Sequence, residues 1–301
     1  MAIRGEHEVT EAVLRELERA ADPRFREIMS AAVRHLHAFV RETKLTEAEF
    51  QQVCAIVAAL GQATTPSHNE VVLAAGSLGI SSLVCLLNNR GFEGQGTTAN
   101  LLGPFWRMNS PRTENRSSIV RSPTPGEPIF VTARVVDDHG EPVAGAEVDV
   151  WHVSPAGLYE NQDAAQADMN LRGKFVTDEE GTIRFRSVKP AGYPIPVDGP
   201  VGALLRAQGR HNMRPAHLHF LIFKPGYKTQ FSQVYSSDDP HLDTDVQFGV
   251  TETLIARYER HGEEPVPYGE PSDTWSALEC RFAIEPGVAK LPRPPITGKV
   301  R

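Results

Sequence analysis

The chain has 301 residues, 40% of them hydrophobic, so it is long enough and apolar enough to build one large domain or two smaller ones. Its 38 Asp and Glu residues outnumber its 31 Lys and Arg residues, which gives a formal net charge of −7. This balance argues against a general binding surface for nucleic acid or anionic membranes, and an anionic substrate would need a local cation.

The first twenty residues and the cysteines indicate the compartment. The opening segment, MAIRGEHEVTEAVLRELERA, has a charged helical pattern and not the apolar pattern of a signal segment. Cys54, Cys85 and Cys280 are an odd number of cysteines without metal-site spacing, so they are predicted to be reduced thiols. We therefore expect a cytoplasmic protein.

Residues 1 to about 95 show helical periodicity. Asp22 and Pro23 predict the N-cap and first residue of one helix, and Thr46 with Glu49 predicts a capping box for the next, which should end at Gly61. The apolar positions of these helices recur at three- and four-residue steps: Phe25, Ile28, Met29, Ala32, Val33, Leu36, Phe39 and Val40, then Phe50, Val53, Val57 and Leu60. Three or four such helices are too few to enclose a core, so they should pack against the rest of the chain or a second subunit.

The longest apolar stretch, residues 71 to 87, nearly reaches the length of a membrane span. Gly76, Ser77, Gly79 and Ser81 dilute it, and no basic cluster flanks it. The stretch is therefore predicted to be a buried helix.

From about residue 120 the hydrophobic period changes to that of strands separated by turns. The predicted strands are residues 128–136, 146–153, 173–178, 182–188, 216–223 and 231–235. They predict an antiparallel β-sandwich over about residues 120 to 265, followed by a proline-rich, extended tail. The expected fold class is α+β, with a helical region over residues 1–95 and a sandwich domain over residues 96–301.

Two histidines interrupt the apolar strand over residues 216–223. Because strand side chains alternate, His217 and His219 should project to one face with Leu221, while Leu218 and Phe220 cover the other. Their Cα atoms would be roughly 6 to 7 Å apart, a spacing at which both rings can reach one metal ion. Two hydrogen-bonded core histidines would give the same pattern.

Two different sets of residues could complete a metal site. His241 would give three imidazoles and an open position for water, as in a zinc hydro-lyase. Tyr159, in SPAGLYE, and Tyr193, in KPAGYPIP, each follow a glycine where a strand exits, so their side chains could turn inward. Either tyrosine could instead pack its ring at the rim of the sandwich.

Five motifs together identify a resemblance. The segments GLYE, AGYPIPVDGPVG and RPAHLHF, with GPFW upstream and LDTDVQFGV downstream, resemble the intradiol ring-cleaving dioxygenases of the catechol and hydroxyquinol type. The resemblance covers nearly the whole chain, including a helical region that forms the dimer interface in this family. It implies a homodimer, which can hold lipid at that interface, and a reaction between O2 and a catecholic substrate.

The resemblance also implies a metal and its ligands. The cofactor would be Fe(III), held by Tyr159, Tyr193, His217 and His219. Two phenolates and two imidazoles suit a hard, trivalent ion, and such an ion offsets the cost of about 4 kcal/mol for ionising each phenol at neutral pH. Arg214 and Gln233 fall where the family has its catalytic arginine and glutamine, and Tyr193 would accept a proton from the substrate.

The substrate implied by the resemblance is hydroxyquinol, benzene-1,2,4-triol, because DGPVG with LLRAQGRH, and LDTDVQFGV, are more similar to hydroxyquinol than to catechol enzymes. Its product would be 3-hydroxy-cis,cis-muconate or maleylacetate. The implied pocket residues are Leu73, Gly76, Ser77, Leu102, Gly103, Pro104, Phe105 and Phe248. Hydroxyquinol enzymes tend to carry an aspartate where this chain has Gly76, so a catechol or substituted catechol, cleaved to a cis,cis-muconate, stays an alternative.

A non-catalytic β-sandwich binding module is a second class of function. The segment GEPVAGAEVDVW is typical of such sandwiches and contains no chemistry of its own. A binding module should purify without stoichiometric metal, which distinguishes it from a ferric enzyme.

Overall fold

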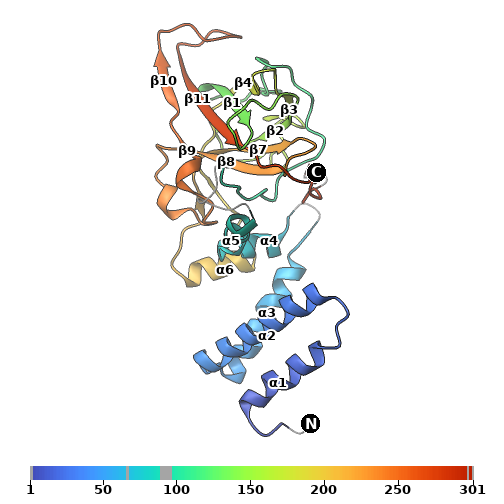
Figure 1. The fold of residues 1–301 in the computed structure, drawn as a ribbon. Helices are drawn as coiled ribbons and strands as arrows, with labels where there is room; N and C mark the ends of the chain where they lie inside the picture. Colours follow the sequence, from blue (N-terminus) through green and yellow to red (C-terminus); the bar gives the residue numbers. More distant parts are fainter. Residues whose placement is uncertain (1–2, 66–67, 89–96, 297, 300–301) are drawn as a thin grey trace. The chain divides into compact units, whose positions relative to one another are not determined.

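The computed structural model describes residues 3–65, 68–88, 97–296 and 298–299 (Figure 1). By internal contacts the chain divides into two compact units, Met1–Ala59 and Leu60–Arg301. The predicted domain boundary, between residues 95 and 96, lies outside the described residues.

The first unit is built from helices α1 (Glu6–Leu17), α2 (Pro23–Thr43) and most of α3 (Glu47–Gln62). The predicted start of α2 is confirmed, since the Asp22 carboxylate accepts hydrogen bonds from the N–H groups of Arg24 and Phe25. The predicted capping box at α3 is also present. Thr46 N–H donates to the Glu49 carboxylate at 2.8 Å, and Glu49 N–H donates to Thr46 Oγ1 at 3.3 Å.

None of the residues of α1, α2 or α3 is buried in the single chain. The apolar positions of these helices include side chains that are about half exposed or more: Phe25, Ile28, Leu36, Phe39, Phe50 and Val57. The first unit therefore presents apolar side chains that its own three helices do not cover.

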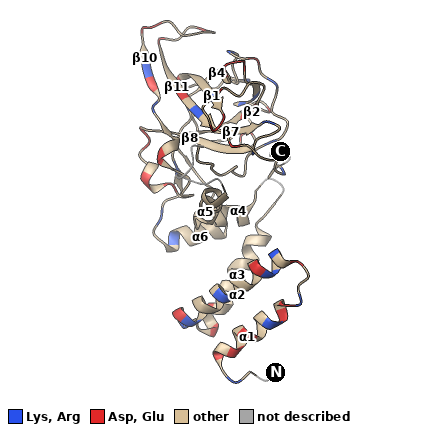
Figure 2. Cartoon of the chain, in the orientation of Figure 1, with Lys and Arg blue, Asp and Glu red and all other residues tan. Residues whose placement is uncertain are grey.

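The apolar stretch predicted as one buried helix is two helices, α4 (Glu70–Ser77) and α5 (Ile80–Asn88), bent by 77°. The break lies at Gly79, whose φ of +72° is a left-handed conformation that glycine adopts without steric cost. No residue of α5 is buried, and the helix carries no Lys, Arg, Asp or Glu (Figure 2). Among the described residues, no single helix is long and apolar enough to cross a bilayer, and α4 with α5 meets that criterion only as a bent pair.

The second unit contains a sandwich of a four-stranded and a five-stranded sheet. The first sheet has the order β10 (Glu259–Gly262), β11 (Thr274–Ala283), β1 (Pro128–Val136), β4 (Thr182–Val188). The second has the order β3 (Arg172–Val176), β2 (Glu147–Trp151), β7 (His217–Phe223), β8 (Gln230–Ser236), β9 (Ile255–Ala256). The short strands β5 (Tyr193–Pro194) and β6 (Met213–Arg214) form a separate pair, linked through helix α6 (Pro200–Ala207). The six predicted strands are confirmed to within two residues at each end.

Strand β11 was not predicted, and it replaces the first part of the predicted tail. This ten-residue strand lies between β10 and β1 and runs parallel to β1, so the sandwich is mixed and not wholly antiparallel. Its alternation was readable, because Leu278 and Phe282 are buried while Glu279 and Arg281 between them are exposed.

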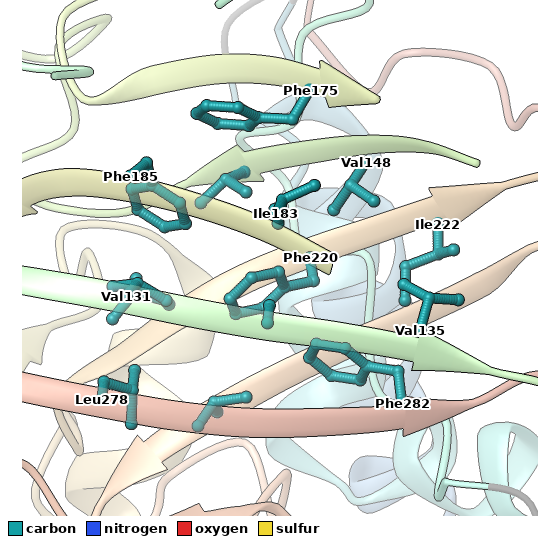
Figure 3. Close-up of a cluster of buried hydrophobic side chains, with 14 of the residues drawn as sticks. Val131, Val135, Val148, Phe175, Ile183, Phe185, Phe220, Ile222, Leu278 and Phe282 are labelled. Atoms are coloured by element: carbon teal, nitrogen blue, oxygen red, sulfur yellow. The ribbon is translucent and has the colours of Figure 1, made fainter. Parts of the chain in front are cut away.

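The main core lies between the two sheets (Figure 3). Val131 and Val135 of β1 meet Phe220 and Ile222 of β7 there. As the alternation predicted, the histidines of β7 project from the opposite face. That face is buried too, under a second apolar cluster that includes Phe105, Trp106, Trp151, Tyr159, Tyr193, Leu221 and Ile296. The sheet is therefore covered on both sides, and the outer side holds the candidate site.

Candidate metal centre and substrate pocket

Strand register gathers the candidate residues on the outer face of the five-stranded sheet. On β7, His219 is opposite Trp151 of β2 on one side and Gln233 of β8 on the other. In the short β5–β6 pair, Tyr193 is opposite Arg214. Strands β7 and β8 carry no Lys, Arg, Asp or Glu (Figure 2), so positive charge reaches this face from other elements, from Arg214 on β6 and Arg172 on β3.

Four nitrogen and oxygen atoms converge at the centre of this face. Tyr159 Oη is 2.9 Å from His219 Nε2 and 3.2 Å from Tyr193 Oη. His217 Nε2 is 3.1 Å from His219 Nε2. All four side chains are buried. The structure thus brings together the four residues that the sequence predicted as ligands.

The two histidines are prepared to act as neutral ligands. His217 Nδ1 donates to the Pro215 carbonyl oxygen at 2.7 Å, and since a carbonyl can only accept, the Nε2 lone pair of the neutral ring faces the cluster. The His219 ring is stacked on Trp151, with centroids 4.6 Å apart and planes at 9°. Burial, reinforced by the Arg214 charge, lowers the pKa of His217 to about 3, and burial also lowers the pKa of His219.

The cluster fits a ferric ion. Burial, and then the neighbouring Tyr193, raise the pKa of Tyr159 well above its ordinary value, so a phenolate there needs a cation inside the site. Protein ligands stand about 2.0 to 2.2 Å from a metal ion, so two ligands of one ion can be about 3 Å apart. The three neighbouring pairs of cluster atoms are 2.9, 3.1 and 3.2 Å apart. The two phenol oxygens are hard donors that suit a trivalent ion, and imidazole nitrogens also bind iron.

The alternative zinc site with three histidines is not assembled. His241 lies away from the cluster, with its ring centroid 5.0 Å from that of His211. Among the described residues, no group of three His, Cys, Asp or Glu side chains could hold a metal ion.

Arg214 lies beside the cluster as a fixed, buried cation. Its Nε and Nη2 atoms donate to the two carboxylate oxygens of Asp245, each at 3.0 Å. Burial alone would lower the pKa of Arg214, but the Asp245 charge together with the nearby Tyr235 and Tyr193 raises that pKa well above its ordinary value. Burial would likewise raise the pKa of Asp245, yet Arg214 holds it below its usual range. The pair stays ionised, and Nη1 is directed at His217 Nε2, 3.4 Å away.

Asp245 was not predicted as a site residue, although it lies within the quoted LDTDVQFGV. The available signal was indirect. An arginine beside buried metal ligands needs a buried counter-charge, and Asp245 is one of the acidic residues of that motif.

Gln233 connects Arg214 to the loop that covers the site. Its Oε1 accepts from Arg214 Nη2 at 2.9 Å and from Tyr235 Oη at 2.6 Å, and its Nε2 donates to the Leu101 carbonyl oxygen at 2.7 Å. In this structure the side chain therefore orients the guanidinium and the loop.

A second charged network supports Tyr159. The carboxylate of the next residue, Glu160, accepts from Arg107 at 2.8 Å and from Arg172 at 2.5 Å. Glu160 and Arg172 are each 1% exposed. This buried arrangement fixes the loop from which the Tyr159 phenol reaches the cluster, and the sequence analysis did not predict it.

A pocket of about 430 Å³ borders the cluster, with Tyr193 and Arg214 in its wall. Five predicted pocket residues line it: Leu73, Leu102, Gly103, Pro104 and Phe105. Gly103 has a φ of +75°, and a Cβ there would lie only 3.1 Å from His219 Cε1. Glycine thus lets the loop close over the histidine ring.

Three predicted pocket residues, Gly76, Ser77 and Phe248, are not part of the described lining. Phe248 is 52% exposed, with its ring under the Arg210 guanidinium at 4.5 Å, because its backbone φ of +52° turns it outward. The position near Gly76 and Ser77 is taken by Gln247, which does line the pocket.

Further lining residues were not predicted, among them Ile195, Pro196, Gln247 and Pro295. Ile195 and Pro196 follow Tyr193 in the quoted AGYPIP, so the motif itself was a signal. Pro295 comes from the proline-rich tail, whose next residue, Ile296, is 1% exposed in the cluster over the sheet. The tail therefore contributes to the site.

Comparison with known proteins agrees with this geometry. Sequence-family models described as "Catechol dioxygenase N terminus" and "Dioxygenase" match residues 22–96 and 101–276. The hydroxyquinol 1,2-dioxygenase of Rhizobium sp. (strain MTP-10005) is 40% identical over 256 residues, which is 85% of this chain and 86% of the relative. The catechol 1,2-dioxygenase of Candida albicans is 36% identical over 253 residues, 83% of this chain and 84% of the relative.

Among solved structures, the hydroxyquinol 1,2-dioxygenase from Pseudomonas putida DLL-E4 superposes with a TM-score of 0.86 at 35% identity. The superposition covers 94% of this chain and 99% of that one. The likeness therefore includes both the helical region and the sandwich.

Proposed function

Because the chain belongs to the intradiol ring-cleavage dioxygenases, we propose that it opens the ring of hydroxyquinol with Fe(III) and O2, between the two adjacent hydroxylated carbons. The observation that carries this proposal is the buried cluster of two phenol oxygens and two imidazole nitrogens beside a pocket and a fixed guanidinium. The identity to hydroxyquinol enzymes supports the choice of substrate.

Tyr159, Tyr193, His217 and His219 would hold the iron. When bound, Fe(III) would chelate the two adjacent substrate oxygens and draw electron density from the ring, which makes a ring carbon reactive toward O2. The protein supplies the rest of the chemistry. Chelation requires the loss of two protons, and of the two tyrosines only Tyr193 is in the described pocket lining. Tyr193 Oη is therefore the phenol oxygen placed to accept a substrate proton.

Arg214 stabilises the negative charge that develops on the ring. Its guanidinium lines the pocket and is fixed by Asp245 and Gln233, so it needs little reorganisation during the reaction. The loop from Leu102 to Phe105 forms an apolar wall that orients the ring and excludes water.

Oxygen uptake by the iron-loaded protein tests this proposal with hydroxyquinol, catechol, pyrogallol and chlorinated catechols. We expect one O2 consumed per ring opened, a muconate-type diacid as product, and the highest kcat/KM for hydroxyquinol. The protein should be red-brown, because phenolate donors on a ferric ion absorb visible light. A colourless protein with a full complement of zinc would contradict the proposal.

The same panel separates the alternatives. A preference for catechol would favour the catechol 1,2-dioxygenase assignment, for which the Candida albicans relative is a precedent. Purification without stoichiometric metal, and without oxygen uptake, would favour a non-catalytic binding module.

We further propose that the first unit forms a homodimer, because its exposed apolar side chains need a partner. Light scattering should give a dimer of the 33.1 kDa chain. Leu36→Asp, at a side chain 62% exposed in the single chain, should shift the protein to monomer. Burying a leucine side chain stabilises an interface by about 1.5 to 3 kcal/mol. A twofold interface would contain Leu36 of both subunits, so the substitution removes this stabilisation twice. His35→Asp is the matched control on the same helix, and a wild-type monomer would contradict the proposal.

We propose that lipid binds in a groove of about 760 Å³ in the first unit. Val9, Val40 and Phe50 give the groove apolar walls for an acyl chain, and Arg41 and Lys44 are placed to contact an anionic head group. Mass spectrometry of an organic extract of the purified protein should detect lipid, and its absence would contradict the proposal.

A further inference from the structure

Gln247 is held in the pocket wall by three hydrogen bonds. Its backbone N–H donates to Asp245 Oδ1 at 3.2 Å, and its backbone carbonyl oxygen accepts from Ser82 Oγ at 3.1 Å. Its side-chain Nε2 donates to Ser77 Oγ at 2.8 Å. Because the same Asp245 carboxylate binds Arg214, the position of the carboxamide is tied to that of the guanidinium.

The carboxamide can occupy its present position only because residue 76 is a glycine. A Cβ added at Gly76 would collide with Gln247 Oε1 and would lie 2.8 Å from Gln247 Cδ. Gly76 is in the last turn of α4, where its backbone conformation does not require glycine. The Gln247 side chain therefore occupies the space that a side chain at residue 76 would fill.

Hydrogen-bond acceptors are few in this pocket. No Asp or Glu is in its described lining, and the only side-chain amides there are Asn69 and Gln247. Asn69 Oδ1 accepts from Val72 N–H at 3.0 Å, where it caps α4. Among the described residues, nothing donates to Gln247 Oε1 within hydrogen-bonding distance. Gln247 thus provides a neutral acceptor in the lining of the pocket.

We propose that Gln247 is a specificity residue that accepts a hydrogen bond from the third hydroxyl of hydroxyquinol, and that Gly76 is required to make room for it. This inference rests on the proposed function and specifies how the site distinguishes its substrate. A neutral amide suits the task, because a carboxylate at the same place would repel the ionised substrate oxygens.

The test compares two substrates of similar size. Hydroxyquinol has a hydroxyl where 4-methylcatechol has a methyl group. A change in the ratio of their kcat/KM values on substitution of Gln247 therefore measures the hydrogen bond to that hydroxyl. We expect Gln247→Leu to lower the ratio of hydroxyquinol to 4-methylcatechol by about three- to tenfold, the range for one net hydrogen bond, mostly by slowing hydroxyquinol. Gln208→Leu, at an exposed glutamine after α6, is the matched control and should leave the ratio unchanged.

A double-mutant cycle tests the coupling to Gly76. Gly76→Ala should lower the same ratio, because the new methyl group displaces the carboxamide. In a Gln247→Ala background, which leaves room for that methyl group, Gly76→Ala should have little further effect. Additive effects would show that the two residues act separately and would overturn the proposed pairing. Because alanine favours the helix, a loss of folding in Gly76→Ala alone would also indicate the collision.

The outcomes separate this inference from the proposed function. Suppose that wild-type protein cleaves hydroxyquinol but Gln247→Leu leaves the ratio unchanged, or lowers kcat/KM equally for both substrates. Gln247 then does not bind the third hydroxyl, and the inference is wrong. If wild-type, iron-loaded protein cleaves neither hydroxyquinol nor any other catecholic substrate of the panel, the proposed function is wrong.

Discussion

Replacing His219 with alanine should remove the metal and, with it, ring cleavage. His219 Nε2 is within 3.1 Å of both His217 Nε2 and Tyr159 Oη, so it is central to the donor cluster. Loss of a supporting contact alone typically weakens metal affinity by about 10- to 100-fold, and loss of a ligand should weaken it at least that much. Iron content by elemental analysis, the visible colour and oxygen uptake should all fall together.

Two further variants serve as comparisons for His219→Ala. His241→Ala changes a histidine whose ring packs on His211, away from the cluster, and should leave iron and activity unchanged. Tyr193→Phe should keep more of the iron than His219→Ala, because Tyr193 Oη lies at the edge of the donor cluster, 3.2 Å from Tyr159 Oη, yet it should lose most turnover, because the phenol that faces the pocket is gone. Iron retained at wild-type level in His219→Ala would mean that the metal binds elsewhere.

The strands that carry the site could be predicted because the alternation of residue types along each strand matches which side chains are buried in the core. In β7 the alternation placed Leu218, Phe220 and Ile222 in the core and His217 with His219 on the opposite face, as the structure has them. The motifs then supplied the tyrosines, which no periodicity could have placed. Tyr159 and Tyr193 come from loops and short strands, and their meeting with β7 depends on long-range packing.

The remaining features depend on contacts between distant segments. Strand β11 pairs with β1, more than one hundred residues earlier, and a parallel pairing over that separation has no local signal. The bend between α4 and α5 was also missed, because the apolar run continues through Gly79. Gln247 and Gly76 are similarly remote in sequence, so their shared packing appears only in three dimensions.

Asp245→Asn should keep the metal but impair both stability and turnover. The substitution preserves the shape of the side chain while it removes the only charge that binds Arg214 directly among the described residues. Both groups are buried, with Arg214 3% and Asp245 4% exposed. Breaking a buried ion pair by neutralising one partner typically costs about 3 to 5 kcal/mol, because the other charge is left buried without compensation. Chemical denaturation at neutral pH should show a loss of that size in the free energy of unfolding.

The effect on turnover follows from geometry. The asparagine oxygen can accept from only one of the two N–H groups that donate to the Asp245 carboxylate, so the guanidinium keeps its hydrogen bonds to Gln233 and Tyr235 but is held less firmly on the other side. Displacement of a catalytic group by about 1 Å can reduce a rate by about a hundredfold, so kcat should fall by about 10- to 100-fold while iron content stays at the wild-type level. Asp243→Asn, at an exposed position two residues earlier, is the matched control. If Asp245→Asn retains full kcat, the rigid placement of Arg214 does not contribute to the reaction, and the role given to this ion pair would have to be withdrawn.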